Sequence, residues 1–256
     1  MGRTYQDVCE KLIGKTEDKK AVRDLKRDLL TLKRKGVNSF ESLRELLLKP
    51  DPPCVYTAMR LLELFEKSRA VPVLLRLLQS GTYAGYAYAA TTLTIVGGKL
   101  AARGCLKILS KHPDHLIRED VVYVLSFMFE QWEVIPALLQ IFTDEQEPIK
   151  NRTQAAEGLG SILSFEYRRR EYKQVGEALL QGLSQAAPEM RFWSAFGLNQ
   201  MRYKKALAKL DELAESDKTL CPGWWTVGER AYDAAFYIRI GRGSGIERTL
   251  TPITQN

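Results

Sequence analysis

The sequence lacks the features of a membrane or secreted protein. None of its uninterrupted apolar runs approaches the roughly 20 residues that a membrane-spanning helix needs. Its start is polar, without the apolar core of a secretory signal, and position 6 is Gln6 rather than the serine or threonine of a myristoylation signal. We therefore expect no membrane partner.

Cysteine is scarce and scattered. The chain has 4 Cys among 256 residues, and no two of them form a CxxC pair. The cysteines are Cys9, Cys54, Cys105 and Cys221. This pattern predicts reduced thiols in a cytoplasmic protein.

Motifs for catalysis, metal binding and cofactor binding are absent as well. His112 and His115 are the only histidines, and with Asp114 or Asp120 they would supply too few ligands for a metal site. There is no GxSxG nucleophile motif and no glycine-rich phosphate loop, and Cys105 occupies a core position. We therefore expect no metal, no cofactor, no catalytic residue and a protein that is not an enzyme.

What the sequence does have is an internal repeat. Hydrophobic residues make up 45% and charged residues 27%, so the chain can bury a core. Apolar pentads recur at steps of 31, 33, 41 and 31 residues. They begin at Leu74, Cys105, Leu138, Leu179 and Leu210.

A second ladder of small and apolar residues lies sixteen residues before each pentad, except where residues have been inserted. It runs through Ala58, Ala89, Val122, Ala155 and Ser194, with a further copy at Ala231, Ala234 and Ala235. Apolar residues in both ladders recur at i, i+3, i+4 and i+7, which indicates helices, and proline and glycine mark the joints. The sequence therefore predicts an all-α chain built from about five two-helix units and a C-terminal half-unit.

The repeat resembles HEAT-like repeats, including the short bacterial kind described as phycobilisome-lyase-like. Such repeats carry a Val/Ile-Arg pair before an Ala-rich first helix, and Ile117-Arg118, Ile149-Lys150 and Met190-Arg191 stand at that place. The resemblance implies a right-handed α-α superhelix, a solenoid of about five to six helix pairs over residues 50–240. We expect residues 1–49 to form an N-terminal helical cap and residues 241–256 a flexible tail.

In such solenoids the second helices line the inner, concave face. The polar position inside successive pentads is Arg76, Lys107, Gln140, Gln181 and Glu212. Arg103, Lys107 and Lys111 add a basic stripe at i, i+4 and i+8. These residues predict a partner-binding groove for an acidic peptide or another anion, and the alternative is an ordinary solvated helix face.

One repeat is about eight residues too long. The extra residues fall near Arg168, Arg169 and Arg170, which stand between Tyr167 and Tyr172. Insertions in repeat proteins often lie on a binding face, so the three arginines between two tyrosines are predicted to contact phosphate and to stack on a base or on a partner side chain. They could instead pair with the glutamates on either side of them.

We expect a non-enzymatic adaptor that binds a protein or peptide in the concave groove. The first alternative is a nucleic-acid-binding protein, because the isoelectric point is about 9.2. A family of DNA glycosylases has HEAT-like repeats, but its Trp-xxx-Asp motif is absent here. A weaker alternative is a chaperone that helps attach a bilin chromophore. The oligomeric state is left open.

The net charge of +7 is unevenly spread. Residues 1–49 carry a net +5 and residues 239–256 a net +2, while residues 50–238 carry 22 basic and 22 acidic side chains. This distribution predicts a balanced repeat region with basic ends, and it disfavours a uniformly basic groove for DNA.

Overall fold

A computed structural model of the chain describes residues 67–80, 86–112 and 114–241, together with seven single positions between Lys20 and Arg34 that are all helical. The chain forms two compact units, residues 1–124 and 125–256, and each is described by itself. The predicted cap over residues 1–49 lies outside the described residues except at those seven positions. The residues of the predicted tail after Gly241 also lie outside the described residues. These two boundaries stay predictions.

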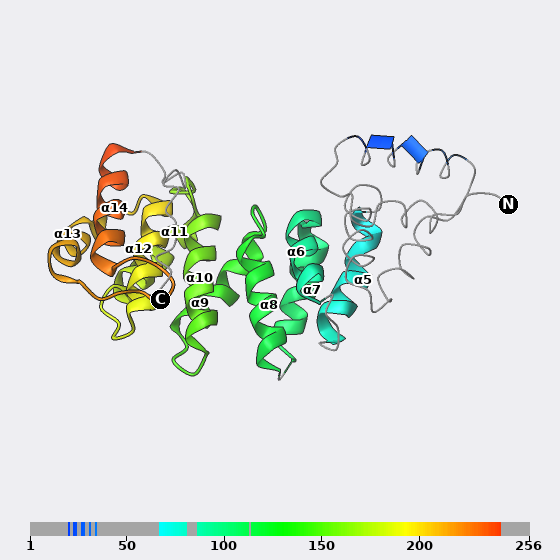
Figure 1. The fold of residues 1–256 in the computed structure, drawn as a ribbon, viewed down its shortest axis with the longest axis horizontal. Coiled ribbons are helices and arrows are strands. Elements are labelled where there is room, and N and C mark those ends of the chain that lie inside the picture. The colour runs from blue at the N-terminus through cyan, green and yellow to red at the C-terminus, as the bar shows by residue number, and fades with distance from the viewer. Residues whose placement is uncertain are drawn as a thin grey trace. The chain divides into compact units, whose positions relative to one another are not determined.

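The described part of the N-terminal unit is helical (Figure 1). Its helices are α5 (Lys67–Ser80), α6 (Tyr86–Val96), α7 (Gly98–Leu109) and α8 (His115–Ser126), the last two residues of α8 crossing the unit boundary.

The C-terminal unit is also helical over its described residues, with one isolated β-bridge between Leu220 and Thr226. Its elements are the 3-10 helix η1 (Trp132–Val134), α9 (Ile135–Thr143), α10 (Ile149–Ile162), α11 (Arg170–Gly182), α12 (Pro188–Met201), the 3-10 helix η2 (Lys204–Ala206), α13 (Leu207–Ser216) and α14 (Val227–Ile240).

The predicted repeat is confirmed over the described residues. The apolar pentads lie in α5, α7, α9, α11 and α13, and the small-residue ladder lies in α6, α8, α10, α12 and α14. In the C-terminal unit α10, α12 and α14 stack on one another, and α9, α11 and α13 each pack on the helix that follows. Over the described residues the chain is therefore all-α and built of paired helices, as predicted, and in the C-terminal unit the pairs stack as in a solenoid.

Glycine residues let neighbouring helices approach closely. A Cβ atom added to Gly160 of α10 would collide with the backbone of Gly197 in α12. In the N-terminal unit a Cβ atom on Gly104 of α7 would meet the side chain of Leu75 in α5. The first contact is backbone against backbone, whereas the second leaves a flexible side chain as the neighbour.

The joints after the helices of the small-residue ladder share a backbone feature. A residue with positive φ follows the end of α6, α8, α10, α12 and α14 within four positions. These residues are Gly97, Glu130, Phe165, Arg202 and Gly241. Only glycine adopts this conformation without strain, so the three other residues each cost about 1–2 kcal/mol.

Arginines bind successive helix pairs together. Arg118 Nη1 donates to the carbonyl of Leu109 at 2.6 Å, and Arg152 Nε donates to that of Phe142 at 3.1 Å. Each bond joins the start of one helix to the end of the helix before it. In α10 this bond is made by Arg152, two residues after the Lys150 of the repeat's Ile-Arg position.

Candidate functional site

One segment of the N-terminal unit, residues 67–112, has charges of a single sign. Residues 67–112 contain seven lysines and arginines and no aspartate or glutamate. All seven lie on α5 and on α7 with the turn after it, and α6 carries none. The balanced charge of the repeat region therefore hides a strongly basic segment.

Exposed basic side chains stand on α5 and α7, two helices that pack together. Leu75 of α5 lies against Gly104 of α7, and Arg76 and Arg103 are their immediate neighbours in the sequence. Arg76, Lys99, Arg103, Lys107 and Lys111 are exposed, and none of them forms an ion pair with another described residue. We call these five residues the α5–α7 basic surface.

An apolar side chain lies on the same face of α7. Leu100 is 53% exposed and stands between Lys99 and Arg103 in the sequence. The opposite face of α7 is buried through Ala101, Ala102, Cys105, Ile108 and Leu109. The predicted stripe of Arg103, Lys107 and Lys111 thus has the exposure that a binding surface needs.

The predicted groove residues farther along the chain belong to the other unit. Gln140 on α9 and Gln181 on α11 are exposed, and Glu212 on α13 pairs with Lys209 at 2.6 Å. The structure brings Arg76 together with the α7 residues within the N-terminal unit. A single groove through all five pentads stays a prediction.

The arginines of the insertion differ in their surroundings. Arg169 places its guanidinium carbon 4.1 Å from the centre of the Trp132 ring and lies 3.3 Å from Glu171. Arg170, the first residue of α11, donates to Glu171 at 3.0 Å. Arg168 lies 5.7 Å from the centre of the Tyr167 ring and is exposed. The open alternative, pairing with glutamate, therefore applies to Arg169 and Arg170.

A neighbouring joint contributes residues that the sequence analysis missed. Arg202, at the end of α12, places its guanidinium carbon 4.1 Å from the centre of the Phe165 ring. Tyr172 Oη donates to the carbonyl of Met201 at 2.7 Å. The only signal was the length of the insertion, because nothing in the sequence links Phe165 to Arg202.

A second tyrosine hydroxyl joins the segment after α12 to α11. Tyr203 Oη donates to Glu177 at 2.7 Å, and Lys205 lies 3.0 Å from the same oxygen. Burial raises the pKa of Tyr203, and the hydrogen bond to Glu177 raises it further. The hydroxyl therefore stays protonated and acts as a fixed donor.

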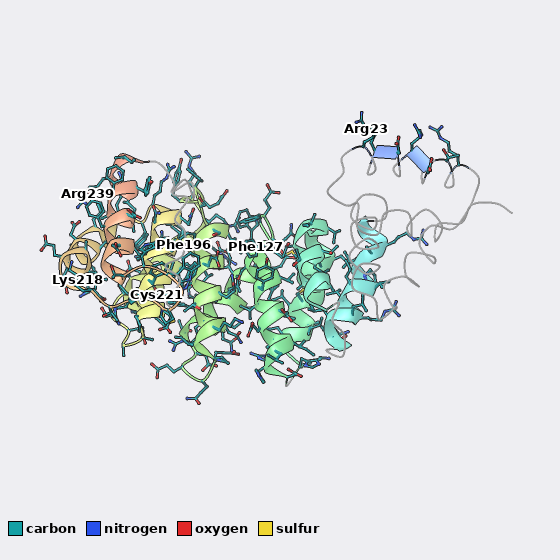
Figure 2. The ribbon with its side chains drawn as sticks, in the orientation of Figure 1. Arg23, Phe127, Phe196, Lys218, Cys221 and Arg239 are labelled. Carbon is teal, nitrogen blue, oxygen red and sulfur yellow. The ribbon has the colours of Figure 1, made fainter. Side chains whose placement is uncertain are left out.

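The C-terminal end of the solenoid contains an aromatic cluster around a buried arginine. Phe192, Trp193, Trp224 and Trp225 pack with ring centres between 5.3 and 5.9 Å apart. Arg230 is only 8% exposed and stacks on Trp225 and Phe192, and burial lowers its pKa to about 10. Figure 2 shows the side chains of this unit, with the buried Phe196 and Cys221 labelled.

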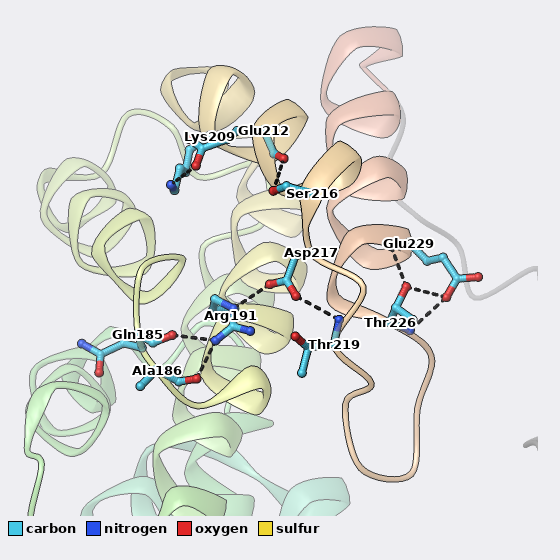
Figure 3. A network of polar contacts seen from close by, with 10 residues as sticks. All are labelled: Gln185, Ala186, Arg191, Lys209, Glu212, Ser216, Asp217, Thr219, Thr226 and Glu229. Atoms are coloured by element: carbon cyan, nitrogen blue, oxygen red, sulfur yellow. Dashed lines mark hydrogen bonds and ion pairs between the residues drawn. The ribbon is translucent and has the colours of Figure 1, made fainter.

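A hydrogen-bonded network ties the start of α12 and the loop before it to the loop after α13 (Figure 3). Arg191 Nε donates to Asp217 at 2.7 Å, and its Nη1 donates to the carbonyls of Gln185 and Ala186 at 2.8 and 2.6 Å. Burial would raise the pKa of Asp217, but hydrogen bonds from Arg191 and Thr219 outweigh it, so the pKa falls below its usual value. Every one of these groups has a partner inside the fold, so the network is structural.

An open pocket of about 420 Å³ adjoins this network on the α14 side. Its polar lining includes Thr226 and Glu229, which form the capping box of α14 by reciprocal hydrogen bonds. The remaining lining residues are Ala214, Lys218, Gly228, Tyr232 and Asp233.

The described residues contain no group of three side chains that could hold a metal ion. His112 accepts a hydrogen bond from the backbone N–H of Asp114 at 3.3 Å. Burial raises the pKa of Cys105 to about 12 and that of Cys221 to about 11, so neither thiol is a thiolate at neutral pH. Among the same residues, no helix has both the length and the apolar character needed to cross a bilayer.

Comparison with known proteins gives likenesses of fold. No family model matches the sequence, and no curated protein sequence is similar to it. The crystal structure of an engineered protein is 18% identical, with a TM-score of 0.50 over 80% of this chain and 98% of that one. Human deoxyhypusine hydroxylase in complex with glycerol is 16% identical, with a TM-score of 0.34 over 92% of this chain and 96% of that one.

The second likeness corrects one expectation. Human deoxyhypusine hydroxylase is an enzyme, which contradicts the prediction that this chain is not one. The prediction rested on missing sequence motifs, and catalytic groups can come from residues that are far apart in a sequence. A likeness of this size transfers no activity to the present chain.

Proposed function

We propose that the chain is a solenoid of HEAT-like repeats that binds a protein partner, and that the α5–α7 basic surface takes an acidic segment of that partner. The observation that carries the proposal is the one-sided charge of residues 67–112, whose cations lie exposed on two packed helices. A solvated helix face usually carries charges of both signs.

The chemistry of the surface favours a protein segment. Carboxylates would pair with Arg76, Arg103 and Lys107, and an apolar side chain would cover the exposed Leu100. Each exposed ion pair contributes about 0–1 kcal/mol, and burying a leucine contributes about 1.5–3 kcal/mol. This surface therefore supports a weak and salt-sensitive complex. Attachment of a bilin chromophore has no support in the contacts described above.

A pair of charge-reversed variants tests the proposal. The α7 variant is Arg103→Glu/Lys107→Glu, and the matched control is Arg168→Glu/Lys204→Glu, which changes the net charge equally in the other unit. The probe is a fluorescein-labelled short peptide of glutamate and leucine, followed by fluorescence anisotropy at low salt. We expect about tenfold weaker binding of the α7 variant and unchanged binding of the control. Equal binding by all three proteins, or equal loss in both variants, would contradict the proposal.

A further inference from the structure

A second basic surface lies at the joints of the C-terminal unit. It is formed by residues 163–173, before and at the start of α11, and residues 201–205, between α12 and α13. The hydrogen bond from Tyr172 to Met201 and the stacking of Arg202 on Phe165 hold the two segments together. We call them together the joint surface.

Half of the cations in residues 125–241, the described part of the C-terminal unit, are concentrated there. Residues 125–241 contain 14 lysines and arginines and 16 acidic residues. The sixteen residues of the joint surface hold seven of those cations and only two of the acids, Glu166 and Glu171. The cations are Arg168, Arg169, Arg170, Lys173, Arg202, Lys204 and Lys205. The joint surface is thus net positive in a unit that is otherwise net negative.

Several of these cations are not neutralised inside the fold. Arg168, Arg202 and Lys204 form no ion pair with any described residue, and the Nε atom of Arg202 is buried without a hydrogen-bond partner. The ring of Phe165, and not a carboxylate, holds the guanidinium of Arg202 in place. Such a guanidinium keeps its charge available for an anion that approaches its edge.

Aromatic rings are exposed among the cations. Phe165 is 58% exposed and Tyr167 is 66% exposed, and each has an arginine over one face of its ring. The other face of each ring is accessible to a ligand, because both rings are more than half exposed.

We propose that the joint surface binds single-stranded nucleic acid, with its cations on the phosphates and its exposed rings stacked on the bases. Unpaired bases stack on aromatic side chains whatever their identity, while cations follow the backbone. A duplex keeps its bases stacked inside and offers nothing to Phe165 and Tyr167. An acidic peptide offers charge but no flat ring. The proposal is independent of the acidic segment proposed for α5 and α7.

The test uses a fluorescein-labelled oligouridine, alone and as its duplex with oligoadenosine, titrated with the full-length protein at several salt concentrations. The joint variant is Arg168→Glu/Lys204→Glu, and the ring variant is Tyr167→Ser, which keeps the charge. The control is Lys209→Glu/Lys218→Glu, which changes the net charge equally and lies outside both basic surfaces. Circular dichroism melting curves confirm that each variant is folded.

We expect the wild type to bind the single strand at least tenfold more tightly than the duplex. The joint variant should bind at least tenfold more weakly, with a salt slope shallower by about 0.7 for each phosphate that is no longer neutralised. The ring variant should weaken single-strand binding severalfold, and the control should bind like the wild type. Equal affinity for the duplex, no effect of Tyr167→Ser, or no binding at low salt would each overturn the proposal.

Discussion

Arginine has different roles in the two units. On α5 and α7 the side chains of Arg76 and Arg103 extend into solvent without an ion-pair partner among the described residues. In the C-terminal unit Arg152, Arg191 and Arg230 are buried or half-buried, and they bind carbonyls, a carboxylate or aromatic rings. Arg118 follows the second pattern within the N-terminal unit. Surroundings decide whether an arginine stabilises the fold or is available to a partner.

The largest expected effect comes from removing one structural arginine. Arg191→Met leaves Asp217, whose side chain is only 9% exposed, and two carbonyls without their donor. We expect a loss of about 3–5 kcal/mol in the free energy of unfolding. Urea unfolding followed by tryptophan fluorescence measures it, because all four tryptophans lie in the C-terminal unit.

The matched change in the N-terminal unit is Arg103→Met. Its side chain is exposed, so we expect the free energy of unfolding from circular dichroism to change by less than about 0.5 kcal/mol. Similar losses in Arg191→Met and Arg103→Met would erase the contrast between the units.

Two glycine contacts compare the packing of the two units, and the expected losses of stability are smaller than for Arg191→Met. Gly160→Ala forces a methyl group against the backbone of Gly197, which cannot move aside, and should cost about 3 kcal/mol. Gly104→Ala meets only the flexible side chain of Leu75 and should cost about 1 kcal/mol. Urea unfolding of both variants checks the order, and a larger loss for Gly104→Ala would refute the packing described for α10 and α12.

The carboxylate of the Arg191 network should make stability depend on pH. The pKa of Asp217 is lower in the folded protein than in the unfolded chain, so its stabilising effect is complete above the unfolded value near 4 and is lost as the pH falls through the folded value. Asp217→Asn should therefore cost about 2 kcal/mol at pH 7 and progressively less below pH 4. A cost that stays constant down to pH 3 would show that the charge of Asp217 contributes nothing.

The helical repeat was predictable because packing repeats in the sequence. The pentads and the small-residue ladder recur at nearly constant spacing, and each copy within the described residues marks a helix that the structure contains. Gly160 and Gly197 illustrate the limit, since only the structure reveals that their backbones touch.

The candidate surfaces were predictable in part. The periodicity of α7 correctly separated the exposed Arg103 and Lys107 from the buried Cys105. The partners of Arg169 and Arg202 were not predictable, because Trp132 and Phe165 reach them through the joints between helices. The charge count of residues 50–238 also misled, since it averaged a basic α5–α7 segment with an acidic remainder of the repeat region.

The central claim is that the exposed cations of α5 and α7 form a partner-binding surface. Amide hydrogen exchange measured with and without a saturating glutamate and leucine peptide tests it most directly. We predict slower exchange in residues 67–80 and 98–111 and no change in residues 163–173. Protection confined to residues 163–173, or no protection in α5 and α7 at saturation, would contradict it.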